Sequence, residues 1–371
     1  MAQRIPAREG DPVDAIETPA LVVDLDALEH NLDAMAAAVA ASGLRLRPHA
    51  KSHKCPDIAR LQLARGAVGV CCQKTDEAIA FVDAGVPDVL LTNEVVAPAK
   101  LRRLADAARR SRVGLLVDSD AGARAASAAA ADAGSVLDAY VEVDVGAGRC
   151  GVAPGDAGAL ARRVASLPGL RYAGLHCYHG AAQHLRTPQA RAQAIASARE
   201  RVLAAKAAVT VAGLDTTVVT GAGTGTWPLE RASGVWNELQ PGSYVFMDAD
   251  YGRNALGPGD VAFAQALFVL ASVTSTPVPG RAVCDAGLKA LAFDSGLPLV
   301  HGRDGVAYER ASDEHGVLAT DAAARPLALG ERVWLIPGHC DPTANLYDWI
   351  VGLRGDRVAA VWPVAARGAL A

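Results

Sequence analysis

The sequence lacks the features that mark membrane, secreted and nucleic-acid-binding proteins. Its apolar stretches are rich in alanine and are broken by charges well before about 18 residues, so they predict no transmembrane helix. The N-terminal segment MAQRIPAREGDPVDAIETPA has no apolar core of the signal-peptide type. No basic run stands out and the net charge is −4, which argues against nucleic acid and membrane surfaces as partners. We therefore expect a cytoplasmic protein.

Cysteine pairs of the CxxC type and a dinucleotide-binding fingerprint are also absent. The seven cysteines are odd in number and scattered, which indicates reduced and mostly buried thiols. They are Cys55, Cys71, Cys72, Cys150, Cys177, Cys284 and Cys340. No GxGxxG motif follows a strand near the start of the chain, and this argues against an NAD-type oxidoreductase.

What the sequence does contain is a regular alternation of short apolar runs with longer helical patterns. With 371 residues, 51% hydrophobic and 20% charged, the chain has a globular composition and room for a large domain plus a smaller one. The apolar runs are Leu44–His49, Ala67–Cys72, Asp88–Asn93, Arg112–Asp118, Tyr140–Val145, Tyr172–Tyr178, Thr216–Thr220 and Leu239–Phe246. Eight strands alternating with helices predict an α/β protein with a (β/α)8 TIM barrel, and a doubly wound open sheet is the alternative.

The pattern changes after residue 258, where long helical patterns stop. The strands expected there, separated by Gly, Pro and Asp turns, are Ala264–Ser275, Arg281–Leu288, Val306–Arg310, Arg332–Leu335 and Trp349–Leu353. We therefore predict a barrel domain of residues 26–257 and a second, mainly antiparallel β domain of residues 1–25 plus 258–371. The early run Ala20–Asp24 precedes a helix with Asp26 as its expected N-cap, and we expect it to pair with the C-terminal domain.

The first predicted barrel strand ends in the segment Arg47–His53, RPHAKSH, which is unusually basic. Active groups of a TIM barrel gather at the C-terminal ends of its strands. Because strand side chains alternate, those at positions 47, 49, 51 and 53 would share one face and project into the barrel mouth. Flanking cations would lower the pKa of Lys51, as an amine nucleophile needs. The alternative is that Lys51 simply reaches solvent.

Two glycine-rich loops follow the seventh and eighth predicted strands. They are Thr220–Thr226, TGAGTGT, and Pro241–Tyr244, PGSY. Their backbone N–H groups and hydroxyls suit a phosphate, and TIM barrels often bind phosphate after these two strands. One such loop is usually only a turn, whereas two at this location, together with Lys51, indicate a phosphate site.

The fifth and sixth predicted strands also end in polar segments. Glu142–Gly151 is rich in glycine and carries Arg149, which is either a surface side chain or part of the site. The sixth strand runs into Tyr178, which could lie along a planar cofactor. His179 and His184 follow and are acid–base candidates, although a single histidine is more often a core residue bound to backbone.

A further cluster, Pro337–Thr343 with the sequence PGHCDPT, places His339 and Asp341 two positions apart. In an extended segment these two side chains would point the same way and Cys340 the other way. Such a pair, with positions left for water or substrate, suits Mn²⁺, Mg²⁺ or Co²⁺ better than a closed zinc site. The alternative is a turn with a capped aspartate before proline.

These residues together resemble the D-threonine aldolase family, relatives of the alanine-racemase-type enzymes that use pyridoxal 5'-phosphate (PLP). The resemblance runs from Thr18–Leu21 to Trp362–Gly368. Its most specific pieces are Arg47–Pro56, Gly69–Lys74, Thr92–Val95, Val141–Val152, Gly221–Thr226, Leu239–Tyr244, Asp285–Lys289, Ser312–Val317 and His339–Thr343. Ala222 departs from the family pattern, where relatives carry a third glycine, but the change keeps the backbone donor.

The resemblance implies a role for each candidate residue. Lys51 would form the Schiff base with PLP, Arg149 would face the pyridine nitrogen, and Tyr178 would flank the ring. Gln73 would line the cofactor or substrate pocket, and His184 would lie near the catalytic base. The residues against the phosphate would be Gly223, Thr224, Gly225, Thr226, Gly242, Ser243 and Tyr244.

The activity implied by the resemblance is cleavage of a D-3-hydroxy amino acid, such as D-threonine, to glycine and an aldehyde. A divalent metal on His339 and Asp341, Mn²⁺ before Mg²⁺, Co²⁺ or Zn²⁺, would polarise the β-hydroxyl. A base, His184 directly or through water, would take the hydroxyl proton. An arginine at the pyridine nitrogen should keep that nitrogen unprotonated. The family also implies a homodimer.

Other activities remain open from the sequence. A 3-hydroxyaspartate aldolase, giving glycine and glyoxylate, is the near alternative, because Asp294–Pro298 and Tyr347–Trp349 resemble that branch. Its substrate would need a cation for the second carboxylate, for which Arg253 and Arg303 are candidates. D-serine dehydratase pairs its metal histidine with a cysteine two residues on, where this chain has Asp341. A racemase would leave the metal pair unexplained, and a non-catalytic PLP carrier would lack the C-terminal domain.

Overall fold

Two sheets organise the computed structural model, which describes residues 4–257 and 260–371. Eight parallel strands curve into one sheet in the order β2-β9-β8-β7-β6-β5-β4-β3. The circle closes where Cys71 pairs with His49 in a parallel bridge and donates to the Pro48 carbonyl at 2.8 Å. The predicted (β/α)8 barrel is therefore confirmed, and the open sheet is excluded.

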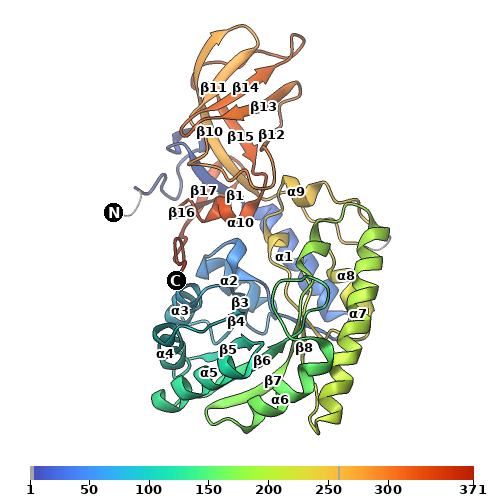
Figure 1. Cartoon of the computed structure of the whole chain (residues 1–371). Coiled ribbons are helices and arrows are strands. Elements are labelled where there is room, and N and C mark those ends of the chain that lie inside the picture. The colour runs from blue at the N-terminus through green and yellow to red at the C-terminus, as the bar shows by residue number, and fades with distance from the viewer. Residues whose placement is uncertain (1–3, 258–259) are drawn as a thin grey trace.

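The barrel strands are short and its helices surround them (Figure 1). The strands are β2 (Arg45–Leu46), β3 (Val70–Cys72), β4 (Asp88–Glu94), β5 (Arg112–Val117), β6 (Leu137–Glu142), β7 (Leu170–Cys177), β8 (Val219–Gly221) and β9 (Glu238–Leu239). The helices are α1 (Leu25–Ala40), α2 (Pro56–Ala64), α3 (Thr75–Asp83), α4 (Pro98–Ala107), α5 (Asp120–Ala133), α6 (Ala157–Ser166), α7 (Pro188–Val211), α8 (Trp227–Ala232) and α9 (Ala249–Gly252).

Local sequence sets where these helices begin and end. Proline occupies the first turn of α2, α4, α7 and α8, where its missing N–H removes no helical hydrogen bond. The hydroxyls of Ser119 and Thr187 accept backbone N–H groups at the starts of α5 and α7. Gly134 ends α5 in the left-handed region, with φ of 61°, where a side chain would be strained.

The second sheet is mainly antiparallel and lies beyond one end of the barrel, with the short helix α10 (Cys340–Ala344) at the junction (Figure 1). Its strands are β1 (Ala20–Asp24), β10 (Leu267–Val278), β11 (Arg281–Cys284), β12 (Leu299–His301), β13 (Val306–Ala311), β14 (Gly316–Thr320), β15 (Arg332–Ile336), β16 (Trp349–Arg354) and β17 (Arg357–Pro363). Strand β1 pairs with β10 and β16, as expected. The sequence predicts neither β12, β14 nor β17, and β12 is exposed at both ends with no alternation to reveal it.

Two predicted element ends are displaced in the structure. The N-cap of α1 is Asp24 rather than Asp26, because the Asp24 carboxylate accepts the backbone N–H groups of Asp26 and Ala27, in the first turn of the helix, at 2.9 and 3.0 Å. Strand β9 ends at Leu239 rather than Phe246, because the chain turns into the 3-10 segment η5 (Ser243–Val245). This early turn brings the second glycine-rich loop over the barrel mouth.

The basic side chains of the first barrel strand do not share one face as predicted. The 3-10 turn η2 (Ala50–Ser52) breaks the alternation after position 49. Arg47 is buried inside the barrel and donates to Glu238 at 2.9 Å and to Asp88 at 2.7 Å. His53 is fully buried against two phenylalanine rings. The expected cluster of four side chains is therefore reduced to those at positions 49 and 51.

Three further predictions concern the chain as a whole. All seven cysteines are free thiols and all but Cys150 are buried. No helix in the described ranges is long and apolar enough to span a bilayer. The predicted domain boundary falls on residues 258–259, which lie outside the described residues. The division into residues 26–257 and 1–25 plus 258–371 therefore stays a prediction.

Candidate active site

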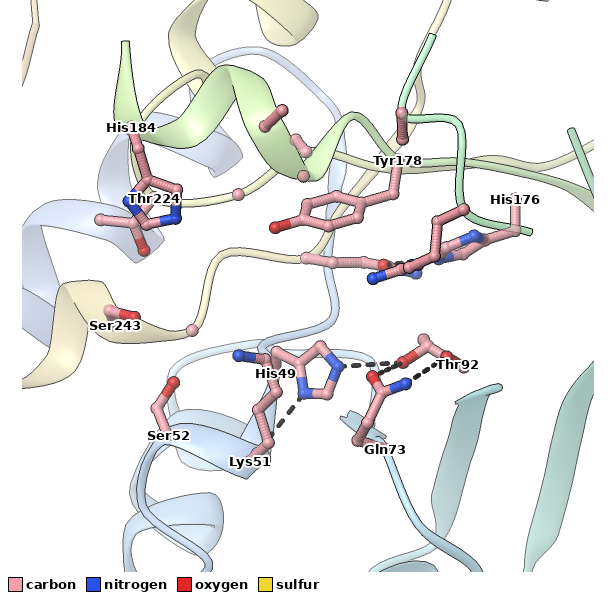
Figure 2. A pocket seen from close by; sticks show the side chains of 18 of the residues that line it. His49, Lys51, Ser52, Gln73, Thr92, His176, Tyr178, His184, Thr224 and Ser243 are labelled. Atoms are coloured by element: carbon pink, nitrogen blue, oxygen red, sulfur yellow. Dashed lines mark hydrogen bonds between the residues drawn. The ribbon is translucent and has the colours of Figure 1, made fainter. Parts of the chain in front are cut away.

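A cavity of about 420 Å³ opens at the C-terminal ends of the barrel strands, a size typical of small-molecule sites. Many of the residues singled out from sequence line it: Lys51, Gln73, Arg149, Tyr178, His184, Gly223, Thr224, Gly242 and Ser243. Figure 2 shows Ser52, Thr224 and Ser243 on one side of this cavity and Gln73, Thr92 and His176 on the other. The candidate residues therefore gather around one cavity at the expected end of the barrel.

Lys51 enters the cavity from the η2 turn, and its ammonium group pairs with the carboxylate of Asp341. Burial alone would lower the pKa of Lys51, but the adjacent Asp341 carboxylate outweighs burial and raises it. The predicted lowering by flanking cations is wrong here, because burial holds the pKa of His49 well below its ordinary value and keeps that ring neutral. An unprotonated amine at Lys51 requires another cation to take its place beside Asp341.

His49 connects the η2 turn, which carries Lys51, to strand β4 through hydrogen bonds. Its Nδ1 accepts the backbone N–H of Lys51 at 3.4 Å, and its Nε2 lies 2.9 Å from Thr92 Oγ1. The same hydroxyl lies 3.2 Å from Gln73 Oε1, and Gln73 Nε2 donates to the Thr92 carbonyl at 3.1 Å (Figure 2). These bonds join His49 and Gln73, which follow β2 and β3, to Thr92 on β4 as one hydrogen-bonded wall.

Each glycine-rich loop approaches its neighbours closely at one glycine, Gly223 in the first loop and Gly242 in the second. A Cβ on Gly242 would lie 2.6 Å from Ser52 Oγ and 2.9 Å from the His49 carbonyl, and one on Gly223 would lie 2.5 Å from Gln183 Oε1. The Ser52 hydroxyl is buried and has no partner among the described residues. A buried donor without a partner, beside two loops in which a glycine allows close backbone approach, fits a phosphate group.

Some residues predicted for the phosphate loops do not line the cavity. The N–H of Gly225 donates to Gln183 Oε1 at 3.0 Å, and Thr226 Oγ1 accepts from Gln183 Nε2 at 2.8 Å and donates to Glu230 at 2.8 Å. Tyr244 lies in the core, and its hydroxyl is bound to a buried glutamine. Gln183 therefore shapes the first loop from behind, a role that its sequence position does not reveal.

Tyr178 and Arg149 provide an aromatic face with a cation beside it. The guanidinium carbon of Arg149 lies 5.9 Å from the Tyr178 ring centre, and one of its nitrogens lies 3.8 Å from the Glu142 carboxylate. His176 lies next to Tyr178, with Nε2 3.1 Å from Gln240 Oε1. Burial lowers the pKa of His176 to about 4, so this ring is neutral. Arg149 is thus the cation at this part of the cavity.

His184 stands at the cavity mouth, with its Nδ1 2.5 Å from Asp250 Oδ2 and its ring centre 5.7 Å from that of Tyr251. His179, the other acid–base candidate, does not line the cavity. Asp250 was not predicted, because nothing in the sequence pairs it with a histidine 66 positions earlier. His49 lines the cavity, in agreement with its expected projection into the barrel mouth, and the unpredicted lining residues include Ser52, Thr92, His176, Gln240 and Tyr251. All but Tyr251 are polar residues within or next to a predicted strand end, which was the available signal.

The prediction that His339 and Asp341 lie in an extended segment is wrong. His339 is the N-cap residue of α10, and Asp341 lies in the first turn of that helix. Their partners differ: His339 Nδ1 is 2.7 Å from Asp294 Oδ2, whereas Asp341 pairs with Lys51 and is 3.4 Å from Ser243 Oγ. Among residues 4–257 and 260–371, no three His, Cys, Asp or Glu side chains cluster as a metal site. A metal here would take two protein ligands and complete its shell with water or substrate.

A TIM barrel joined to an antiparallel sheet, with a lysine after the first barrel strand and phosphate-type loops after the last two, defines an alanine-racemase-like architecture. The family model for the alanine racemase N-terminal domain matches residues 23–250, and a serine dehydratase domain model matches residues 266–353.

Relatives of nearly full length place the chain more narrowly. A D-threonine aldolase of Arthrobacter sp is 46% identical, over 98% of this chain and 96% of its own. A 3-hydroxy-D-aspartate aldolase of Paracoccus denitrificans (strain Pd 1222) is also 46% identical, over 98% and 95%. The crystal structure of D-threonine aldolase from Filomicrobium marinum is 50% identical, with a TM-score of 0.96 and coverage of 98% and 99%. The chain belongs to the D-threonine aldolase and 3-hydroxy-D-aspartate aldolase family, as its motifs predict.

Proposed function

We propose that the protein is a PLP-dependent lyase that cleaves D-3-hydroxy amino acids of the D-threonine type to glycine and an aldehyde. The observation that carries the proposal is the amine of Lys51 in a cavity whose wall includes both glycine-rich loops. Two aldolase relatives of nearly full length support the same reaction.

The residues of the cavity suit PLP in three places. Lys51 Nζ would hold the aldehyde carbon, and Tyr178 and Arg149 would lie against the ring and its nitrogen. The groups proposed for the phosphate are the Ser52 hydroxyl and the loop residues Gly223, Thr224, Gly242 and Ser243. When bound, PLP supplies a sink for the electron pair left at the substrate Cα when the Cα–Cβ bond breaks.

His184 is proposed as the base that accepts the proton of the substrate β-hydroxyl. It is half-exposed at the cavity mouth, where a ring nitrogen can reach an entering substrate. Loss of that proton lets the Cβ–O bond become a carbonyl as the Cα–Cβ bond breaks, which releases the aldehyde. His49 and His176 are unsuited to the role because both rings are buried and hydrogen-bonded to the wall.

A divalent metal on His339 and Asp341 is the finer part of the proposal. Burial raises the pKa of Asp341, but Lys51 and His339 outweigh it and keep the carboxylate ionised. With Lys51 held by PLP, the free ammonium beside this buried carboxylate would be gone, and a divalent cation would balance its charge. The metal would supply Lewis-acid polarisation of the β-hydroxyl oxygen. One imidazole and one carboxylate with open positions favour Mn²⁺ over Mg²⁺, Co²⁺ or Zn²⁺.

The charges around the cavity favour a neutral β-substituent over a carboxylate. Arg253 donates to Asp250 at 2.9 Å and to the Ser295 carbonyl at 2.7 Å, so it is already committed. Arg303 pairs with Glu331 in the second sheet and does not line the cavity. The 3-hydroxy-D-aspartate aldolase activity of a relative makes that reaction the second candidate.

A product assay on three substrates tests the proposal directly. D-threonine, D-3-hydroxyaspartate and D-serine are incubated in parallel with PLP-loaded protein and Mn²⁺. We expect glycine and acetaldehyde from D-threonine at the highest rate. Faster release of glyoxylate from D-3-hydroxyaspartate would favour the second candidate, and pyruvate from D-serine would displace both aldolase assignments.

Removal of the metal is expected to stop cleavage and leave the cofactor in place. After EDTA treatment and desalting, D-threonine cleavage should fall to background while the yellow colour of bound PLP persists, and Mn²⁺ should restore the rate. The His339→Ala variant should behave like chelated protein even with Mn²⁺ present. Full activity after thorough chelation would remove His339 and Asp341 from the mechanism.

The Gly242→Ala substitution is expected to weaken PLP binding at least about tenfold, which corresponds to about 1.4 kcal/mol. The added Cβ would meet the Ser52 hydroxyl and the His49 backbone, which belong to the proposed phosphate end. Gly155→Ala is the matched control, because its Cβ would meet nothing within 4 Å. The PLP dissociation constant, measured by fluorescence of the apoprotein, checks the result. Equal constants for wild type and Gly242→Ala would exclude this loop as the phosphate site.

A further inference from the structure

Asp250 is a buried carboxylate that touches the proposed base without lining the cavity. Its side chain is 6% exposed. It lies on α9, where the next residue, Tyr251, does line the cavity. Three side chains converge on it: His184 Nδ1 at 2.5 Å, Arg186 at 2.5 Å and Arg253 at 2.9 Å. The family resemblance assigns this aspartate no role.

We propose that Asp250 is a positioning residue, which holds His184 Nδ1 so that Nε2 is the atom that accepts the substrate proton. The inference rests on the proposed function of His184 as base. It adds which ring nitrogen of His184 accepts the proton, and it names Asp250 as the group that determines this.

The hydrogen-bond chemistry of the pair determines the tautomer. Burial raises the pKa of Asp250, but hydrogen bonds from Arg186, Arg253 and His184 outweigh it and lower the pKa to about 2. The carboxylate is thus ionised and can only accept, so His184 Nδ1 must carry the hydrogen in this bond. In a neutral imidazole the other nitrogen, Nε2, then has the free lone pair that a base needs.

The two arginines make Asp250 rigid as well as ionised. Arg186 also donates to the Asp250 carbonyl and to Asn254 Oδ1, each at 2.7 Å, and Arg253 donates to the Ser295 carbonyl. Both guanidinium groups are therefore anchored on two sides. Because the carboxylate cannot rotate without breaking these bonds, the imidazole bound to it keeps its direction.

The segment around α9 also connects His184 to the segment Pro337–Asp341, which carries His339 and Asp341. The N–H groups of Ala249 and Asp250 donate to the carbonyls of Pro337 and Gly338 at 3.0 and 3.2 Å. The carboxylate of the nearby Asp248 accepts the N–H of Cys340 at 2.8 Å. One short helix therefore sets the position of the base relative to the residues proposed for the metal.

A double-mutant cycle on the PLP- and Mn²⁺-loaded enzyme tests the proposal. Asp250→Asn should lower kcat for D-threonine about 10²-fold, with KM changed less than about threefold, because it removes a proton-transfer geometry and no substrate contact. In a His184→Ala background the same Asp250→Asn change should cause no further loss, since its effect acts through His184. Losses that multiply in the double variant would overturn the proposal.

Asp138→Asn is the matched control. Asp138 is also a buried aspartate held by two arginines, Arg112 at 2.5 Å and Arg171 at 2.6 Å, but it lies at the start of β6, away from the cavity. We expect this variant to lose stability and to keep the wild-type kcat. A fall in kcat equal to that of Asp250→Asn would mean that any broken aspartate–arginine cluster has the same effect, and would overturn the proposal.

Nitrogen NMR of histidine-labelled protein gives a second readout that needs neither turnover nor a folded Asp250 variant. The chain has nine histidines, and the signals missing from His184→Ala identify those of His184. In wild-type protein we expect Nδ1 to be the protonated nitrogen at neutral ring charge. The opposite tautomer would overturn the proposal even if cleavage is confirmed. Failure to cleave D-threonine would instead contradict the proposed function and leave this tautomer measurable.

Discussion

Replacing Lys51 with alanine is expected to give a colourless protein that cleaves D-threonine about 10³–10⁴-fold more slowly than wild type, the scale of a lost positioned catalytic group. The substitution removes the amine that would hold the cofactor. It also leaves the Asp341 carboxylate, which is only 8% exposed, without its ammonium partner. Absorbance of PLP-treated, desalted protein and a glycine assay check the two parts of the result.

Lys51→Arg separates the two functions of this lysine. The guanidinium keeps a positive charge for Asp341 but is not an amine nucleophile. We expect Lys51→Arg to melt close to the wild-type apoprotein and to be as colourless and inactive as Lys51→Ala. Full cofactor absorbance in Lys51→Ala would contradict the assignment of the attachment site.

Arg47→Leu is expected to lower the free energy of unfolding by about 3–5 kcal/mol, because it removes the buried partner of the Glu238 carboxylate. Arg47 is 1% exposed and its partner Glu238 is fully buried, so neither charge can be solvated by water. Burial alone would lower the pKa of Arg47, but Glu238 and Asp88 raise it, so the guanidinium stays charged. Denaturant unfolding of the apoprotein, followed by circular dichroism, gives the value.

Arg45→Ala is the comparison that isolates burial. Arg45 contacts the same carboxylate, with its nitrogen 2.9 Å from Glu238 Oε2, but its side chain is 37% exposed. We expect a loss of about 1 kcal/mol or less, because water screens this pair. Equal losses for the two arginines would show that Glu238 depends on total positive charge rather than on the buried partner.

The barrel could be predicted from the sequence because each of its strands and helices is marked by residues within that element. Each strand is a short apolar run, each helix has its own stop signals, and the eightfold count follows from their alternation. A candidate site could be predicted from the barrel, since Lys51, Arg149 and the glycine-rich loops all lie in segments that follow strands. The second sheet was predicted less completely, because a strand such as β12, exposed at both ends, has no apolar alternation.

The rest of the site depends on which side chains meet across the fold. The sequence places Lys51 among basic neighbours, whereas the structure pairs it with Asp341, 290 positions away, and reverses the direction of its pKa shift. The 3-10 turn at Ala50–Ser52 has no signal in a run that otherwise alternates. Asp250 was missed for the same reason, since an aspartate is recognisable as a histidine partner only in three dimensions.

The pairing of β1 with β10 and β16 has a consequence for biosynthesis. Residues 20–24 leave the ribosome long before residues 267–278 and 349–354, so β1 waits unpaired through most of translation. The carboxylate of Asp341 also arrives late, after the whole barrel has been made. A chain released before residue 341 would carry Lys51 without the carboxylate that pairs with it. Synthesis of the segment that carries Asp341, and not of the barrel alone, is therefore needed to give Lys51 the surroundings that the structure shows.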